Sequence, residues 1–225
     1  MTGKQAILRQ AVDRLLGCLI FPNETLLLSM RKRPSGLINF ADSLFLYASA
    51  KYGGGNGWIV EIGSYKGLST VFLALGAIHN GRGEMVLACD PHREGTYKEF
   101  QNTIRSFQLK KVVKPAIMTS EECASQWDKP VRLLWIDGDH SYTSVQKDVR
   151  LWSRYLIPGG IIALHDYTWD GPSTVFQQEV LSSSEFCGVG YLANIAYASR
   201  NFCNNPKLFR RFRILEKIRK PFVAG

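Results

Sequence analysis

Between residues 58 and 166, short apolar runs alternate with longer segments whose apolar residues recur at helical spacing. The runs predict strands at Trp58–Ile62, Met85–Cys89, Val112–Met118, Val131–Ile136 and Ile161–Leu164. Because a helical segment separates successive runs, the strands are expected to pair in parallel through crossover connections. Strands as apolar as these need cover on both faces. The alternation therefore predicts an α/β fold.

The remaining apolar patterns complete the expected architecture. The covering helices are predicted at about Ser69–Ile78, Tyr97–Gln108 and Thr143–Leu156. Two later runs, Gly188–Leu192 and Ile195–Ser199, are close enough in sequence to form an antiparallel hairpin. We therefore expect a Rossmann-like, mainly parallel sheet with helices on both faces and an antiparallel edge hairpin.

A glycine-rich break divides the chain into parts. Four of the five residues of Gly53–Gly57 are glycine, which is typical of a loop. Before the break, Gln5–Leu19 predicts an amphipathic helix and Leu44–Tyr52 the end of another. We predict a helical N-terminal segment over 1–56 that covers a substrate, a central domain over 57–200, and a basic tail over 201–225.

The net charge of +9 is concentrated at the ends of the chain. Residues 200–225 contain eight Lys or Arg and one Glu, whereas residues 51–199 contain 14 basic and 15 acidic side chains. A solvated tail explains this pattern, and so does contact with an anionic membrane surface. Nucleic acid is a less favoured partner, since few aromatic residues are interleaved with the basic ones and no RNA-binding module is recognisable.

Cysteine usage indicates a reducing compartment. The five cysteines are odd in number and form no CxxC or Cys/His cluster, so free thiols are expected. No leader-like pattern and no stretch long enough to span a bilayer stand out in the 225 residues. We therefore expect a cytoplasmic protein.

Ionisable residues follow four of the predicted strands. They are Glu61, Asp90, Asp137 with Asp139, and His165 with Asp166. The carboxyl ends of parallel strands meet at one edge of the sheet, where ligands bind in open α/β folds. One such residue would mean little, but four strand ends that converge predict an active site.

The loop after the first strand is the most informative of these. Gly63 permits a tight turn, and Gly67 opens the next helix, whose free N–H groups suit a carboxylate or phosphate. The third glycine of a dinucleotide loop is missing. Glu61 disfavours a phosphate and favours an ammonium group. A tight turn without a ligand remains the alternative.

Taken together, EIGSYKGLST, ACDPH, WIDGDHSY and PGGIIALHDYTWDG resemble the class I S-adenosylmethionine-dependent methyltransferases. The resemblance covers about Trp58–Gly171, where Trp169 and Gly171 also match. It is nearest to the small O-methyltransferases of the catechol and caffeoyl-coenzyme A type and to the methyltransferase-24-like family. It implies that residues 57–200 are a domain that binds S-adenosyl-L-methionine.

The resemblance also implies roles for individual residues. The methionine end of the cofactor would lie on a loop made of Glu61, Gly63, Ser64, Tyr65, Gly67 and Ser69. Asp90 would bind the ribose, and Thr119 and Ser120 would lie near the adenine. Asp137 belongs to the same cofactor site. Asp137, His165 and Asp166 fall where metal-dependent members hold a divalent cation, Mg²⁺ or Mn²⁺.

Two departures from the family pattern bear on the chemistry. Metal-dependent members have Asp-Asn or Asp-Asp in place of His165-Asp166, and Mg²⁺ prefers oxygen ligands, so a softer ion or no ion stays open. The catechol-type catalytic lysine is replaced by His140. We predict His140 as the base, with Asp139 beside it. The alternative is that Asp137 and Asp139 only cap the following helix.

The expected function is O-methylation of a small-molecule or sugar hydroxyl. No NPPY-type tetrad for amine methylation and no Pro-Cys for pyrimidine C5 methylation is present. Two alternatives remain: a non-catalytic cofactor-binding scaffold whose basic tail contacts a membrane or nucleic acid, and a Rossmann-type oxidoreductase. The sequence leaves a homo-oligomer open.

Overall fold

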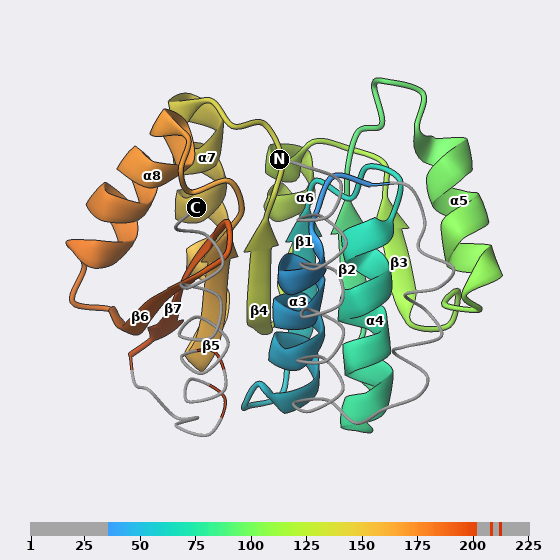
Figure 1. The fold of residues 1–225 in the computed structure, drawn as a ribbon, viewed down its shortest axis with the longest axis horizontal. Helices are drawn as coiled ribbons and strands as arrows, with labels where there is room; N and C mark the ends of the chain where they lie inside the picture. The colour runs from blue at the N-terminus through green and yellow to red at the C-terminus, as the bar shows by residue number, and fades with distance from the viewer. Residues whose placement is uncertain (1–35, 202–207, 209–211, 213–225) are drawn as a thin grey trace, which may run out of the picture.

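The computed structural model describes residues 36–201 together with Leu208 and Phe212, and Figure 1 shows their arrangement. The helix expected over Gln5–Leu19 lies outside these residues. Seven strands form one sheet in the order β3-β2-β1-β4-β5-β7-β6. They are β1 (Trp58–Ile62), β2 (Val86–Cys89), β3 (Val113–Ala116), β4 (Val131–Ile136), β5 (Leu156–Leu164), β6 (Phe186–Leu192) and β7 (Ile195–Arg200).

The pairing confirms the fold class that the sequence predicts. Strands β1 to β5 pair in parallel, while β7 is antiparallel to both β5 and β6. The order reverses between β1 and β4, which are neighbours in the sheet. This reversal opens a crevice at the carboxyl ends of β1 and β4, where α/β sheets bind ligands.

Helices cover both faces of the sheet (Figure 1). The first face carries α3 (Phe40–Tyr52), α4 (Leu68–Asn80) and α5 (Tyr97–Ser106). The second carries α6 (Ser120–Ser125), α7 (Tyr142–Ser153), α8 (Asp170–Val175) and the π-helix η1 (Phe176–Leu181). Neighbouring strand residues alternate between the two hydrophobic clusters, so that Ile59 belongs to the first and Val60 to the second. The alternation explains why these strands are apolar throughout.

The expected junction between α7 and β5 is wrong. The helix ends at Ser153 rather than Leu156, and β5 begins at Leu156 rather than Ile161. Pro-Gly-Gly at 158–160 reads as a loop, yet it lies inside the strand, with Gly159 at a φ of 79°. The β4–β5 register shifts between Val131 and Leu133, which identifies a bulge that accommodates these residues.

Three short helices were not expected from the sequence. Each of α6, α8 and η1 contains six residues. Six residues give fewer than two turns, which is too short for a helical period to be recognised. The other element boundaries differ from expectation by a few residues at most, apart from α3, whose first turn was not recognised.

Helix α3 packs closely on α4 and belongs to the main core. A β-carbon added at Gly76 of α4 would lie 2.6 Å from the carbonyl oxygen of Tyr47, so the close approach of the two helices requires glycine there. Asn39 caps α3, because its side chain accepts from the amide of Asp42 at 3.1 Å while the Asp42 side chain accepts from the Asn39 amide. The cap fixes where α3 begins, next to the carboxyl edge of the sheet.

Arg132 joins the end of α3 to the sheet. Its side chain is fully buried, and it donates hydrogen bonds to the carbonyl oxygens of Ser49 and Ala50. It also forms an ion pair with Glu84, which Arg82 contacts at 3.1 Å. One buried guanidinium thus adds charged donors to two carbonyls in the last turn of α3, which also accept the Gly53 amide and the Asn80 side chain.

Two residues of the predicted basic tail lie in the core. Leu208 and Phe212 are fully buried, and the Phe212 ring lies 4.7 Å from Phe45 and 5.1 Å from Tyr197, measured between ring centroids. Phe212 therefore packs on α3 and β7. Among the described residues, no helix is both long and apolar enough to cross a membrane.

We expect Arg132→Met to lower the free energy of unfolding by about 3 kcal/mol, because it leaves the buried Glu84 carboxylate with a single cationic partner. Urea denaturation followed by circular dichroism measures the change. The double variant Arg132→Met/Glu84→Gln should regain part of the loss, since it also removes the charge. A single variant as stable as the wild type would contradict the role of Arg132.

Candidate active site at the carboxyl edge of the sheet

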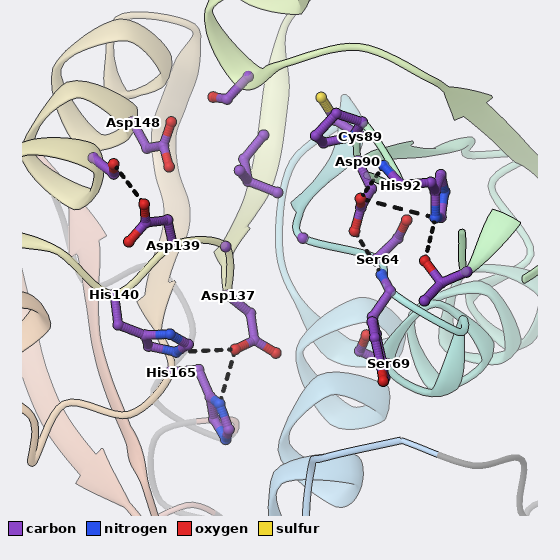
Figure 2. Close-up of a pocket in the computed structure, with 18 of the residues that line it drawn as sticks. Ser64, Ser69, Cys89, Asp90, His92, Asp137, Asp139, His140, Asp148 and His165 are labelled. Atoms are coloured by element: carbon purple, nitrogen blue, oxygen red, sulfur yellow. Dashed lines mark hydrogen bonds and ion pairs between the residues drawn. The ribbon is translucent and has the colours of Figure 1, made fainter. Parts of the chain in front are cut away.

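A cavity of about 720 Å³ opens at the carboxyl ends of the parallel strands, and Figure 2 shows residues that line it. Its volume is in the range of small-molecule and cofactor sites. The lining includes twelve of the residues expected from the sequence: Gly63, Ser64, Tyr65, Ser69, Asp90, Thr119, Ser120, Asp137, Asp139, His140, His165 and Asp166. The two others are the buried Glu61 of β1 and Gly67, the N-cap of α4.

The loop after β1 passes very close to the loop after β4. Gly63 has a φ of 88°, and a β-carbon added to it would lie 2.1 Å from the carbonyl oxygen of Asp137. The Asp137 amide donates to the carbonyl oxygen of Ile62 at 2.8 Å. Only glycine fits at position 63, for both the positive φ and the close approach. The cavity floor is therefore made of backbone.

Glu61 is a buried carboxylate beneath this floor. It is fully buried, and its Oε2 accepts a hydrogen bond from the Thr70 hydroxyl. Burial raises the pKa of Glu61 to about 8 although the Ser69 and Thr70 side chains lower it, and the nearby Asp137 and Asp90 raise it further. Within the described residues, Oε1 is buried without a hydrogen-bond partner. Oε1 is therefore left for a hydrogen-bond donor that a ligand brings.

Further unsatisfied groups lie at the same end of the cavity. The hydroxyl of Ser64 is buried and has no hydrogen-bond partner among the described residues. Helix α4 begins at Leu68 with the left-handed Gly67 as N-cap, and no side chain caps its first amides. Free amides at a helix N-terminus attract an anion. A zwitterion, with its ammonium at Glu61 and its carboxylate at α4, fits this pair of features.

Asp90 connects the loops after β1 and β2. Its two carboxylate oxygens accept the amides of Tyr65 at 2.8 Å and His92 at 2.6 Å. Both donors have positive φ, 43° and 48°, which non-glycine residues rarely adopt. Each oxygen keeps a lone pair for a ligand hydroxyl. Asp90 is thus held in one orientation toward the cavity, as Figure 2 shows.

His92 was not expected to belong to the site. Its side chain is buried, lines the cavity, and its Nδ1 lies 2.9 Å from the Thr96 hydroxyl. Burial lowers the pKa of His92, although Asp90 opposes the shift. The position three residues after the end of β2 was the available signal, but a solvated loop explains that position equally well.

The loop after β3 forms the far end of the cavity. Thr119 is the N-cap of α6, and its hydroxyl accepts the Glu122 amide at 3.2 Å. The Ser120 hydroxyl accepts the indole N–H of the buried Trp152 at 2.8 Å. Both residues thus have structural roles and also line the cavity.

Four ionisable side chains meet at the ends of β4 and β5. Ligand atoms of Asp137, His140, His165 and Asp166 all lie within 4.8 Å of one another. His140 Nε2 lies 3.0 Å from Asp166 Oδ2 and 3.8 Å from Asp137 Oδ1. Neither contact is a hydrogen bond, so this nitrogen has no hydrogen-bond partner among the described residues and is available to a ligand. The neighbouring carboxylates, Asp137 first and Asp166 after it, raise the pKa of His140 despite partial burial.

His165 lies between two carboxylates. Its Nδ1 is 2.9 Å from Asp137, and its Nε2 is 3.2 Å from Asp42 of α3. Burial alone would lower its pKa, but these two partners outweigh burial and raise the pKa of His165 to about 10. The sequence could not indicate Asp42, which is 123 positions away in the chain. Helix α3 therefore contributes directly to the site.

Hydrogen bonds of Asp139 and a ring contact from Trp169 hold the loop that contains His140. Asp139 accepts hydrogen bonds from the Ser141 amide at 2.8 Å and the Ser144 hydroxyl at 3.2 Å, and the Ser141 amide in particular lowers the pKa of Asp139. The half-exposed Trp169 ring packs 4.8 Å from the His140 ring. The N-cap of α7 is Ser141 rather than Asp137 or Asp139, so the contacts of Asp139 hold the loop before the helix and thereby orient His140.

Comparisons with known proteins agree with this geometry. A family model described as a methyltransferase domain matches residues 60–167. An O-methyltransferase from Bacillus cereus in complex with S-adenosylhomocysteine superimposes with a TM-score of 0.63 at 15% identity, over 84% of this chain and 97% of that one.

Two further solved structures share the fold. TomG from Streptomyces achromogenes, an O-methyltransferase of tomaymycin synthesis in complex with S-adenosylmethionine, has a TM-score of 0.60 at 11% identity and 74% and 82% coverage. CalS11, a TDP-rhamnose 3'-O-methyltransferase of calicheamicin biosynthesis, has a TM-score of 0.60 at 15% identity and 88% and 95% coverage. At such identities the likeness concerns the fold.

The pKa of Glu61 predicts how the stability of the ligand-free chain depends on pH. The folded pKa of about 8 lies above the ordinary value of 4.5, so the folded state binds more protons than the unfolded state between these values. Stability therefore falls as the pH rises through this window. We expect Glu61→Gln, which cannot ionise, to lose less stability than the wild type between pH 5 and 8.

Thermal melts at pH 5 and pH 8 measure this difference. The exposed Glu94 offers a matched control, because Glu94→Gln removes a carboxyl that water already solvates. Parallel pH profiles for the wild type and Glu61→Gln would show that the buried carboxyl is not the cause.

Proposed function

We propose that this S-adenosylmethionine-dependent methyltransferase transfers the methyl group to a hydroxyl oxygen of a small molecule or sugar. The observation that carries the proposal is the cluster around His140 at the open edge of the sheet, where an imidazole nitrogen lies beside two carboxylates and has no hydrogen bond among the described residues. A hydroxyl acceptor needs a base to remove its proton, and His140 is positioned as one.

The residues at the other end of the cavity fit the cofactor. The unpartnered Oε1 of Glu61 suits the ammonium of its methionine end, and the uncapped amides near Ser69 suit the carboxylate. Gly63, Ser64 and Tyr65 would complete this cradle, and Asp90 would take the ribose hydroxyls. When bound, the cofactor supplies a methyl group activated on a sulfonium.

The chain then has three tasks in the proposed reaction. It orients the acceptor hydroxyl, it removes the hydroxyl proton at His140 Nε2, and it keeps the resulting imidazolium beside Asp166 and Asp137. Asp139 contributes indirectly, because its hydrogen bonds from Ser141 and Ser144 fix the loop that contains His140. Trp169 limits the positions that the His140 ring can take.

A divalent cation fits the same cluster in part. Asp137 and Asp166 offer oxygen ligands of the kind that Mg²⁺ and Mn²⁺ prefer, and both are partly exposed to the cavity. His165 would have to exchange one of its carboxylate contacts for the ion. We propose Asp137 and Asp166 as the main ligands, with His165 as the third. Such an ion would lower the pKa of the acceptor hydroxyl.

Several observations support a small acceptor over other classes. Each of the solved relatives described above is named as an O-methyltransferase, and one acts on a nucleotide sugar by its name. An oxidoreductase is not favoured, since the family match is to a methyltransferase domain. The cytoplasmic location, a homo-oligomer and a membrane contact of the basic segment stay predictions.

Cofactor binding provides the first test. We expect S-adenosylhomocysteine to bind the wild type with micromolar affinity and Asp90→Ala to weaken it by at least about 10-fold, because hydrogen bonds to a charged group contribute about 1.5–3 kcal/mol. Isothermal titration calorimetry, with and without Mg²⁺ or Mn²⁺, measures both affinities. Asp128→Ala, at an exposed and distant carboxylate, is the control. No binding under any condition would refute the proposed function.

Turnover tests the role of His140. With a hydroxyl acceptor found by screening, we expect His140→Gln to lower kcat by about 10²-fold or more while the affinity for S-adenosylhomocysteine is unchanged. Methyl transfer is followed by mass spectrometry of the product. An unchanged kcat would remove His140 from the chemistry without affecting the family assignment.

A further inference from the structure

Asp42 is a buried carboxylate to which the proposed reaction assigns no task. It lies in the first turn of α3, and its side chain is 1% exposed. Its Oδ2 lies 3.2 Å from Nε2 of His165, the residue that follows β5. His165 lines the cavity, and Asp42 contacts the ring nitrogen that does not face Asp137. Burying a carboxylate is costly, so a contact of this kind indicates a role for the charge.

Helix α3 itself holds the carboxylate of Asp42 in place. Oδ2 also accepts the amide of Asn39 at 3.1 Å, as part of the capping box. The dipole of a helix favours a negative charge in the first turn. Oδ1 is buried and has no hydrogen-bond partner among the described residues. The charge is therefore fixed on a helix that packs in the core, and its contacts are made by one oxygen.

The ring of His165 is also held, and its two nitrogens have different surroundings. The fully buried Trp135 of β4 packs against it, with 5.4 Å between the ring centroids. Nε2 faces the buried Asp42, whereas Nδ1 lies 2.9 Å from Asp137 Oδ1 and 3.4 Å from Asp166 Oδ2. Figure 2 shows the contact between the ring and Asp137. Nδ1 is therefore the nitrogen that a ligand in the cluster would meet.

The spacing of these atoms suits a shared cation. Two ligands of one ion at ~2.1 Å lie roughly 3.0–3.4 Å apart when the geometry is octahedral or tetrahedral. The distances from His165 Nδ1 to the two carboxylates, 2.9 and 3.4 Å, are close to this spacing. An ion held by Nδ1 would leave the Nε2–H with Asp42. Histidines that ligate a metal commonly donate their other N–H to a carboxylate in this way.

His165 has to give up one of its two carboxylate contacts to bind an ion, and the two choices differ in cost. Giving up Asp42 would take a partner from a buried carboxylate. Giving up Asp137 costs less, because Asp137 is itself a member of the cluster and can turn to the same ion. A nitrogen ligand also changes which ion is preferred, since Mg²⁺ takes oxygen ligands whereas imidazole suits transition metals.

We propose that Asp42 is a positioning residue, which accepts the Nε2–H of His165 and so presents Nδ1 as a nitrogen ligand that makes the cluster prefer transition-metal dications to Mg²⁺. The proposal rests on the proposed function, and specifically on its divalent cation at Asp137 and Asp166. It gives α3, through Asp42, an influence on the choice of ion. It also states that the contact of His165 with Asp137 is the one exchanged for the ion.

The binding of two metal ions provides the test. Isothermal titration calorimetry measures the affinities of tag-free protein for Co²⁺ and for Mg²⁺, with and without S-adenosylhomocysteine. We expect the wild type to prefer Co²⁺ by at least about 10-fold, because Co²⁺ accepts the imidazole nitrogen readily. The visible absorption of bound Co²⁺ reports its ligands and should change when His165→Gln removes the nitrogen.

The variant Asp42→Asn tests the positioning role. Its amide oxygen can still accept the Asn39 amide, so the cap is kept while the charge is lost. We expect a loss of about 10-fold or more in Co²⁺ affinity, as for other partners of a ligating histidine, and of about 3-fold or less in Mg²⁺ affinity. Removal of a nearby negative charge would by itself weaken both ions equally and leave their ratio unchanged.

Two controls separate this role from a structural one. Ser43→Ala removes a buried hydroxyl of the same helical turn, which donates to the Asn39 carbonyl at 2.9 Å, and it should leave the ion preference unchanged. The double variant Asp42→Asn/His165→Gln should bind Co²⁺ about as tightly as His165→Gln alone, because Asp42 acts through His165. A further loss in the double variant would overturn the positioning role.

The outcomes distinguish this proposal from the proposed function. If the wild type binds S-adenosylhomocysteine but neither ion, or both ions with equal affinity, the assignment of Asp42 is wrong while methyl transfer assisted by His140 stands. The same holds if Asp42→Asn keeps the wild-type ratio. If S-adenosylhomocysteine does not bind either, the proposed function fails as well. The wild-type preference and its loss in His165→Gln do not depend on the folding of Asp42→Asn.

Discussion

Two backbone segments pass each other at the point where the sheet order reverses, and the site depends on this crossing. The loop after β1 can run against the carbonyl of Asp137 only because residue 63 is glycine. The crossing fixes Asp137 at the end of β4 and leaves the buried Glu61 just below the cavity. A side chain at position 63 would push the two loops apart and separate the cofactor end of the cavity from the ionisable cluster.

The carboxyl groups around the cavity fall into two classes by their burial. Glu61 and Asp148 are nearly or fully buried and receive few donors from the protein, so burial raises the pKa of both. Asp90 and Asp139 are instead held by backbone amides. The first pair is suited to donors that arrive with a ligand, whereas the second pair is satisfied before any ligand binds. The distribution matches a cofactor that carries positive charge at its methionine end.

The sequence predicts the parts of this arrangement that depend on local pattern. Apolar runs locate the strands, and ionisable residues at the ends of four of them locate the edge of the sheet that carries Asp90 and Asp137. Contacts made by the faces of helices could not be predicted in the same way. Asp42 reaches His165 across 123 residues, and Asp148 looks like any polar residue of an amphipathic helix. The start of β5 was missed because Pro-Gly-Gly favours a loop unless a bulge accommodates it.

The contact between Asp42 and His165 has a consequence for how such chains diversify. The glycine-rich break at 53–57 resembles a junction at which N-terminal segments could be exchanged between related genes. An exchange at that junction would nevertheless remove Asp42, and His165 would keep Asp137 as its main carboxylate partner. Recombination could preserve the ionic arrangement only if the incoming segment brought its own carboxylate to the same place. The residues that must be inherited together to keep this site therefore begin at Asn39, the N-cap of α3, well before the first strand.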